Sequence, residues 1–77
     1  MKVTYKAEIT VDAKDTDTQG KHAYVVALCY GGLMEDPEIH YTDYQVVRAD
    51  SAEEARKKYN EINNCSYFYG KVMSQVW

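Results

Sequence analysis

Apolar and polar residues alternate one by one at the start of the chain. Odd positions from Val3 to Val11 are apolar, and the positions between them are polar. A period of two places successive side chains on opposite faces of a strand, so this pattern predicts one half-buried strand over residues 3–11. The turn formers of residues 12–21, DAKDTDTQGK, end it.

Two further segments have the composition of strands. Residues 22–30, HAYVVALCY, are apolar on both faces, which is typical of a central strand. Residues 39–47, IHYTDYQVV, are rich in β-branched and aromatic residues. Between them lie Gly31-Gly32 and Asp36-Pro37, both favourable for turns, so the segment predicts a hairpin loop.

The clearest local signal is a helix over residues 51–62. Ser51 and Glu54 have the spacing of a capping box. Apolar residues then recur every three or four positions, and Glu-Lys pairs stand four apart in the favourable order. Asn63-Asn64 is suited to a left-handed helix end.

The resulting order, β-β-β-α-β, with a last strand within residues 66–77, predicts a single α+β domain. Because the helix has only a sheet to pack against, we expect a two-layer sandwich with one helix on one face of a mostly antiparallel four-stranded sheet. We expect the last strand beside the first. The other face of the sheet has no predicted cover, and its candidate residues are Tyr24, Tyr30, Tyr41 and Tyr69.

Composition narrows the function classes. The 77 residues carry a formal charge of −3 and eight tyrosines, and no Lys or Arg occurs between His22 and Val47. This balance argues against general nucleic-acid binding, which needs a basic face. The alternating N-terminus is unlike a signal peptide, and no apolar run reaches membrane-spanning length, so we expect a cytoplasmic protein that does not contact a membrane.

The sequence contains only weak candidates for a metal-binding or catalytic site. Asp15, Asp17 and Gln19 resemble the start of a calcium loop, but Val26 stands where its closing Glu belongs. Cys29 and Cys65 lie at no metal-ligand spacing, and nothing places either beside a histidine as a nucleophilic pair would require. We therefore expect free thiols, no cofactor and no metal, and we keep a cysteine enzyme only as a third hypothesis.

The excess of tyrosine beside an acidic segment favours a protein-binding surface, because tyrosine is enriched at interfaces. The alternative for each tyrosine is a place in the core with its hydroxyl at the rim. The residues that we predict to contact a partner are Glu35, Asp36, Glu38, Tyr41, Asp43 and Tyr44.

The segments VVRADSAEEARKKYN, a strand entering a capped helix, and YGKVMSQVW resemble a pattern in small proteins of bacteriophages and mobile elements, among them anti-CRISPR inhibitors. The resemblance covers about residues 44–77 and transfers no site residue. It implies a phage-encoded, non-enzymatic inhibitor in the bacterial cytoplasm that blocks the basic, nucleic-acid-binding surface of a CRISPR-Cas nuclease. The alternative is a homo-oligomer, such as a homodimer, serving as a structural or ligand-binding module through the open sheet face or a free edge strand.

Overall fold

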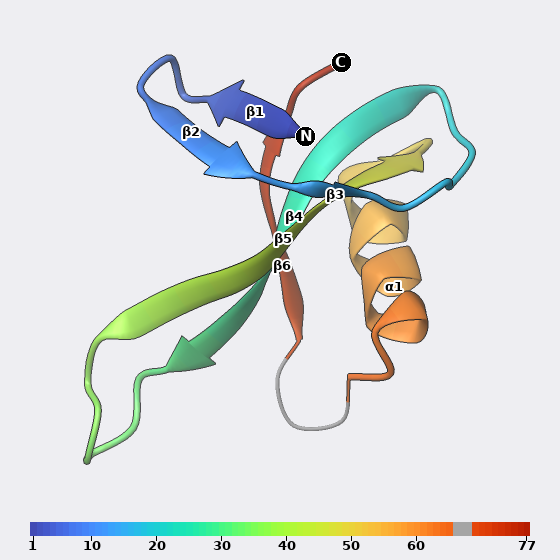
Figure 1. Cartoon of the computed structure of the whole chain (residues 1–77). Helices are drawn as coiled ribbons and strands as arrows, with labels where there is room; N and C mark the ends of the chain where they lie inside the picture. Colours follow the sequence, from blue (N-terminus) through green and yellow to red (C-terminus); the bar gives the residue numbers. More distant parts are fainter. Residues whose placement is uncertain (66–68) are drawn as a thin grey trace.

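A four-stranded sheet is the centre of the fold (Figure 1). The computed structural model describes residues 1–65 and 69–77. In chain order its elements are β1 (Lys2–Tyr5), β2 (Ile9–Asp12), β3 (Lys14–Asp15), β4 (His22–Gly31), β5 (Ile39–Ala49), α1 (Ala52–Ile62) and β6 (Gly70–Gln75). The sheet order is β3-β5-β4-β6, and only the short β3 runs parallel to its neighbour. The predicted α+β class, with a mostly antiparallel sheet and one helix packed on it, is confirmed.

Helix α1 begins and ends where its local signals predict. The Ser51 hydroxyl accepts a hydrogen bond from the Glu54 amide at 3.2 Å, which satisfies one of the free N–H groups of the first turn. The predicted pairs Glu53–Lys57 and Glu54–Lys58 form at 3.7 and 3.0 Å. Asn64 has a φ of 53°, and the Cys65 amide donates to the Asn60 carbonyl, as in a Schellman motif.

The main core lies between α1 and the sheet. Ala55 and Tyr59 of the helix pack on a cluster from the two central strands: Tyr24, Val26, Val47 and Ala49. Tyr24 therefore lies beneath the helix, and its predicted place on the opposite face is wrong. A Cβ at Gly70 would overlap the ring of Tyr59, so β6 passes the helix closely only because this position is glycine.

The N-terminal segment differs from its prediction. Residues 3–11 form two strands, β1 and β2, joined by a turn in which Lys6 and Ala7 have φ values of 52° and 62°. These strands pair only with each other, as a separate two-stranded sheet. The prediction of one continuous strand within the main sheet is wrong.

This N-terminal hairpin reaches the sheet face opposite α1. Val3 of β1 packs against a second cluster formed by Ala13, Ala23 and Val46. Figure 1 shows the hairpin on the side of the sheet away from the helix. The expectation that this face lacks a cover is therefore wrong for the half of the sheet near the termini.

The last strand, β6, also has a different neighbour in the sheet from the one predicted. β6 pairs antiparallel with β4 at the edge of the sheet, not beside β1, so the predicted neighbour is wrong. Residues 66–68, part of the segment predicted to hold this strand, lie outside the described residues.

Candidate protein-binding site at the tip of the β4–β5 hairpin

The β4–β5 hairpin extends well beyond the rest of the sheet (Figure 1). The register of β6 along β4 ends at the Leu28–Gly70 pair, and β3 pairs with β5 only at Gln45 and Val46. Residues 30–42, here called the arm, thus form a two-stranded projection. Two-stranded ribbons expose both edges, so the arm is accessible from several sides.

A tight turn closes the arm, as the Gly-Gly and Asp-Pro signals predict. Gly31 and Gly32 have φ values of 98° and 72°, which only glycine adopts without strain. The Gly32 amide donates to the Glu38 carbonyl at 3.0 Å. Leu33 and Asp36 exchange backbone hydrogen bonds at 2.9 and 3.1 Å, which places Met34 and Glu35 at the apex.

Three side chains brace the turn. The Asp36 carboxylate lies 3.0 Å from Nε2 of His40, an ion pair whenever the imidazole is protonated. The ring of His40 stacks on Tyr30, with centroids 5.1 Å apart and planes 28° apart. Asp36 is therefore engaged in holding the tip, whereas the side-chain carboxylates of Glu35 and Glu38 make no hydrogen bond or ion pair within the described part of the chain.

The tip is also unexpectedly apolar. Met34 is fully exposed, and Leu33 and Ile39 are 61% and 57% exposed. Sequence reasoning missed these residues, because it treated the segment as an acidic loop. Their signal was present, since Leu33 and Met34 are large apolar residues inside a turn, where neither strand pairing nor a core explains them.

The six predicted contact residues lie at three places along the hairpin. Glu35, Asp36 and Glu38 lie together at the tip. Tyr41 lies on the flank of the arm, where the ammonium of Lys71 is 5.5 Å from its ring centroid and 3.3 Å from its hydroxyl. Asp43 and Tyr44 lie at the base of the arm and not at the tip.

Asp43 belongs to a β-bulge. Val26 pairs with Gln45 and Leu28 with Thr42, so Asp43 and Tyr44 together face Ala27 alone. Asp43 has a φ of 50°, and its carbonyl accepts a hydrogen bond of 2.9 Å from the Tyr59 hydroxyl. Burial, followed by the charges of Asp43 and Cys65, raises the pKa of Tyr59 to about 12. The backbone of Asp43 thus fixes the base of the arm to α1.

Tyr44 packs inward from the same bulge. It joins the second cluster and lies against Tyr5, with ring centroids 6.5 Å apart. Burial of Tyr5, together with its hydrogen bond and repulsion with Tyr44, raises the pKa of the Tyr5 hydroxyl. Tyr44 therefore acts mainly in the core, as the alternative reading of the tyrosines proposed.

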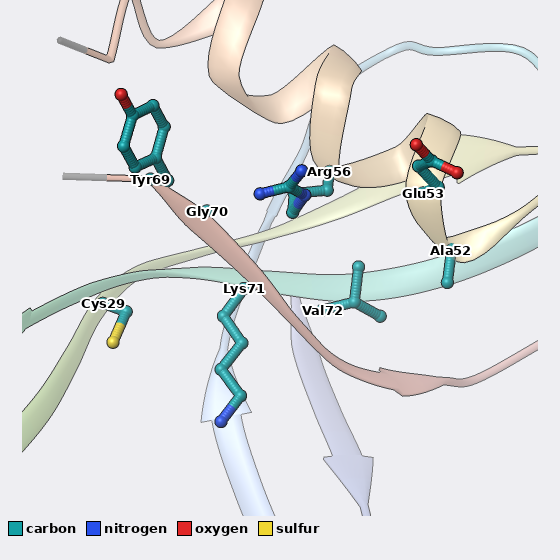
Figure 2. Close-up of a pocket in the computed structure, with 8 residues that line it drawn as sticks. All are labelled: Cys29, Ala52, Glu53, Arg56, Tyr69, Gly70, Lys71 and Val72. Carbon is teal, nitrogen blue, oxygen red and sulfur yellow. The ribbon is translucent and has the colours of Figure 1, made fainter.

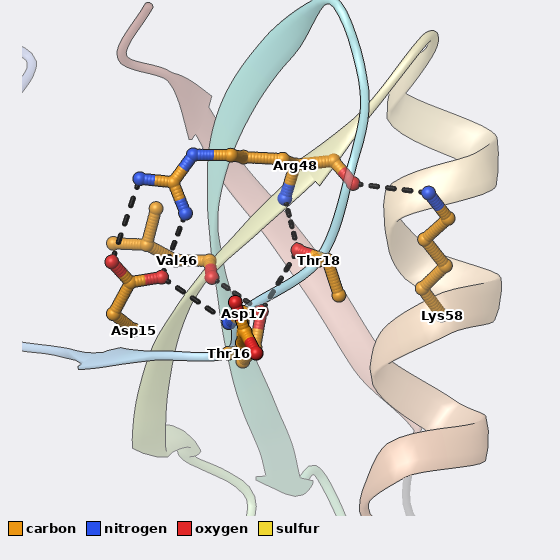
Figure 3. Close-up of polar contacts among 7 residues, drawn as sticks. All are labelled: Asp15, Thr16, Asp17, Thr18, Val46, Arg48 and Lys58. Carbon is orange, nitrogen blue, oxygen red and sulfur yellow. Dashed lines mark hydrogen bonds and ion pairs between the residues drawn. The ribbon is translucent and has the colours of Figure 1, made fainter.

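The segment resembling a calcium loop instead clamps the chain to β5 (Figure 3). Arg48 reaches the Asp15 carboxylate at 2.7 Å, and this hydrogen bond lowers the pKa of Asp15. The Thr16 hydroxyl donates to the Val46 carbonyl at 2.7 Å, and the Thr18 hydroxyl accepts from the Arg48 amide at 2.6 Å. The Arg48 guanidinium thus pairs with the carboxylate that would be the first ligand of a calcium loop.

The cysteines and histidines, the remaining candidates for a catalytic or metal-binding site, do not come together. Cys29 and Cys65 are free thiols, and no hydrogen bond between the described residues joins either to a histidine. Within residues 1–65 and 69–77, no three His, Cys, Asp or Glu side chains come together as metal ligands would. The helix of this part of the chain is too short and too polar to cross a membrane.

No family model matches the chain, and neither a curated protein nor a solved structure matches it.

Proposed function

We propose that this domain is a non-enzymatic binding protein that inserts the tip of its arm into a basic surface of another protein. In its most concrete form, the domain is a small phage-encoded inhibitor that occupies a nucleic-acid-binding surface of a CRISPR-Cas nuclease. The carboxylates of the arm take the place of phosphates on that surface.

One observation carries the proposal: exposed apolar side chains and free carboxylates share the same projecting turn. Met34 stands at the apex with Leu33 and Ile39 beside it, and Glu35 and Glu38 flank them. Binding energy at interfaces comes mainly from a few central, desolvated side chains, while charges at the rim set orientation and encounter rate. The tip has both components in the arrangement that a basic pocket with an apolar floor requires.

The surrounding charge strengthens the argument. No Lys or Arg lies between His22 and Val47, so no Lys or Arg within the arm itself neutralises its carboxylates. Such a concentrated charge accelerates association with a basic partner at low salt and loses this effect as screening increases. The Asp36–His40–Tyr30 contacts hold the turn in place before binding, which lowers the entropy lost on docking.

The decisive experiment reverses the free carboxylates without disturbing the turn. Glu35→Lys with Glu38→Lys suits this purpose, because Asp36 braces His40 and its replacement would alter the tip itself. The assay is plasmid interference in bacteria that carry a CRISPR-Cas nuclease. We expect the wild-type domain to restore plasmid uptake and the double variant to lose this effect.

Two further variants complete the design. Met34→Ser removes the apolar apex and keeps every charge, so we expect it to weaken inhibition as well. Glu8→Lys with Glu61→Lys makes the same change in net charge at exposed positions outside the arm and should inhibit like wild type. Full inhibition by the Glu35/Glu38 variant, with an unchanged thermal unfolding curve, would refute the arm as the binding element.

A further inference from the structure

A groove runs along β6, on the side of the molecule where α1 meets the sheet edge (Figure 2). Its volume is about 580 Å³. The floor comes from Gly70 and Val72 of β6, and one wall comes from Ala52 and Arg56 of α1. This volume falls within the range of sites that hold small ligands or short peptide segments.

The groove exposes the backbone of an edge strand. In the described part of the chain, β6 pairs with β4 on one side and with no strand on the other. The Tyr69 carbonyl accepts from the Cys29 amide, so the backbone groups of Tyr69 and Lys71 face β4. Because these directions alternate in an antiparallel pair, Gly70 and Val72 face outward.

The Gly70 amide supports this assignment, because it donates to the Asn60 side chain at 2.7 Å instead of to β4. The outward carbonyl of Gly70 and the outward N–H and C=O of Val72 then have no partner strand. These three groups are the ones to which an additional strand would bind.

Two cations lie on opposite sides of this edge. In Figure 2, Arg56 is on the helix side of the β6 ribbon and Lys71 is on the other side. Among the described residues, neither side chain has a carboxylate within ion-pair distance. The ammonium of Lys71 lies against the ring and hydroxyl of Tyr41, and no carboxylate of the described residues compensates its charge. The one carboxylate in the groove, Glu53, is paired with Lys57.

We propose that this groove binds an extended, acidic segment of another protein, which adds to β6 as a fifth strand of the sheet. Successive side chains of a strand point to opposite faces, so two consecutive acidic residues would reach Arg56 and Lys71 respectively. Val72 and the ring of Tyr69 supply apolar contact for the neighbouring residues.

Two observations indicate that the bound segment comes from a different protein. If β6 paired with β6 of a second copy, the Arg56 and Lys71 side chains of the two copies would lie close together, and this repulsion between like charges disfavours such a dimer. The chain's own acidic segment is closed into a turn by the Leu33–Asp36 hydrogen bonds and is not extended. The inference is independent of the proposed function, because the groove and the arm have opposite charge and share no residue.

The test uses a fluorescein-labelled peptide, Thr-Val-Thr-Glu-Asp-Thr-Val-Thr with blocked ends, titrated into the whole ¹⁵N-labelled domain. We expect saturable binding, with the largest amide shifts along β6 and protection of the Val72 amide from exchange. A peptide with Lys-Lys in place of Glu-Asp should not bind. A peptide N-methylated at alternate backbone amides keeps its charge but lacks donors for strand pairing, and should bind at least about tenfold more weakly.

Protein variants separate this site from the arm. Arg56→Glu with Lys71→Glu should weaken peptide binding at least about tenfold, a loss of about 1.4 kcal/mol. Lys2→Glu with Lys21→Glu is the matched charge control and should stay within about twofold of wild type. The Glu35→Lys/Glu38→Lys variant should bind the peptide as wild type does. The groove proposal is therefore tested separately from the proposed function of the arm.

Three results would overturn the proposal. One is the lack of saturation by the acidic peptide up to about 1 mM. Another is equal binding of the N-methylated peptide, because strand addition requires those amides. The third is a set of shifts centred on residues 31–38 in place of β6.

Discussion

Replacing Tyr59 with Phe removes one hydroxyl from the largest side chain that is fully buried among the described residues. That hydroxyl donates to the Asp43 carbonyl at 2.9 Å, at the bulge where the arm begins. A typical hydrogen bond contributes about 0.5–1.5 kcal/mol, and a carbonyl left unpaired in a fully buried site costs about 1–3 kcal/mol; the Tyr59–Asp43 bond is part-buried, so the lower part of this range applies. We therefore expect Tyr59→Phe to lower the free energy of unfolding by about 1–2 kcal/mol at pH 7.

The pH dependence tests the cause of this loss. The pKa of Tyr59 is raised from 10.0 in a free side chain to about 12 in the fold. Its contribution to stability is complete below pH 10 and disappears as the pH rises towards 12, because only the unfolded chain ionises in that interval. A shift of this size corresponds to about 2–3 kcal/mol. The Phe variant lacks this contribution, so its unfolding free energy should fall less between pH 10 and 12.

The measurement is urea unfolding followed by circular dichroism, with wild type and variant compared at each pH. The difference between the two proteins cancels the ionisation of the other tyrosines and the lysines, which both share. Tyr69→Phe is the control: that side chain is 56% exposed, and its loss should change stability by less than about 0.5 kcal/mol. If wild type and Tyr59→Phe lose stability in parallel above pH 10, burial of this phenol does not control the alkaline response.

Three other substitutions test single features of the fold. Ala7→Gly should raise the melting temperature by a few degrees, because Ala7 has a φ of 62° in the N-terminal turn and glycine removes about 1 kcal/mol of strain. Gly31→Ala should lower the unfolding free energy by about 1–3 kcal/mol in urea titrations, because its φ is 98° and a Cβ would overlap the Glu38 carbonyl. Asp15→Asn should flatten the acid limb of a pH–stability curve: Arg48 lowers the pKa of Asp15, so its contribution is present above about pH 4 and is lost as the pH falls below that value. An unchanged melting temperature, a tolerated alanine or an identical acid limb would contradict the corresponding assignment.

The sequence determines some elements more clearly than others. Helix α1 was predictable because its cap, ion pairs and end signal are local, each within five residues of its partner. The N-terminal hairpin was not, because its turn spans three residues, Lys6 to Glu8, and leaves the apolar residues of both strands on odd positions. The turn also lacks glycine and asparagine, so neither pattern nor composition distinguishes this hairpin from one long strand.

Only part of the candidate site could be predicted from the sequence, because the rest depends on tertiary contacts. The excess of carboxylates is a property of composition and needs no fold to be seen. The structure places Glu35 and Glu38 at the tip and Asp43 at the base, in the bulge opposite Ala27, where the Asp43 carbonyl accepts from the Tyr59 hydroxyl; this tertiary contact has no local signal. Likewise, Met34 is exposed at the apex of an arm that lies beyond the Leu28–Gly70 pair of the described sheet, and the extent of this pairing has no local signal.

Tyr59 links the two surfaces on which the proposals depend. Its hydroxyl holds the bulge from which the arm leaves the sheet, and its ring occupies the space beside Gly70, where the edge groove begins. A second bulge, at Met73 of β6, lies opposite the same part of β4. Since bulges increase local twist, we expect the sheet to twist most strongly in this region, which Tyr59 contacts from the helix. The acidic tip and the cationic edge thus lie on different elements around Tyr59, and the two proposals assign them to partners of opposite charge.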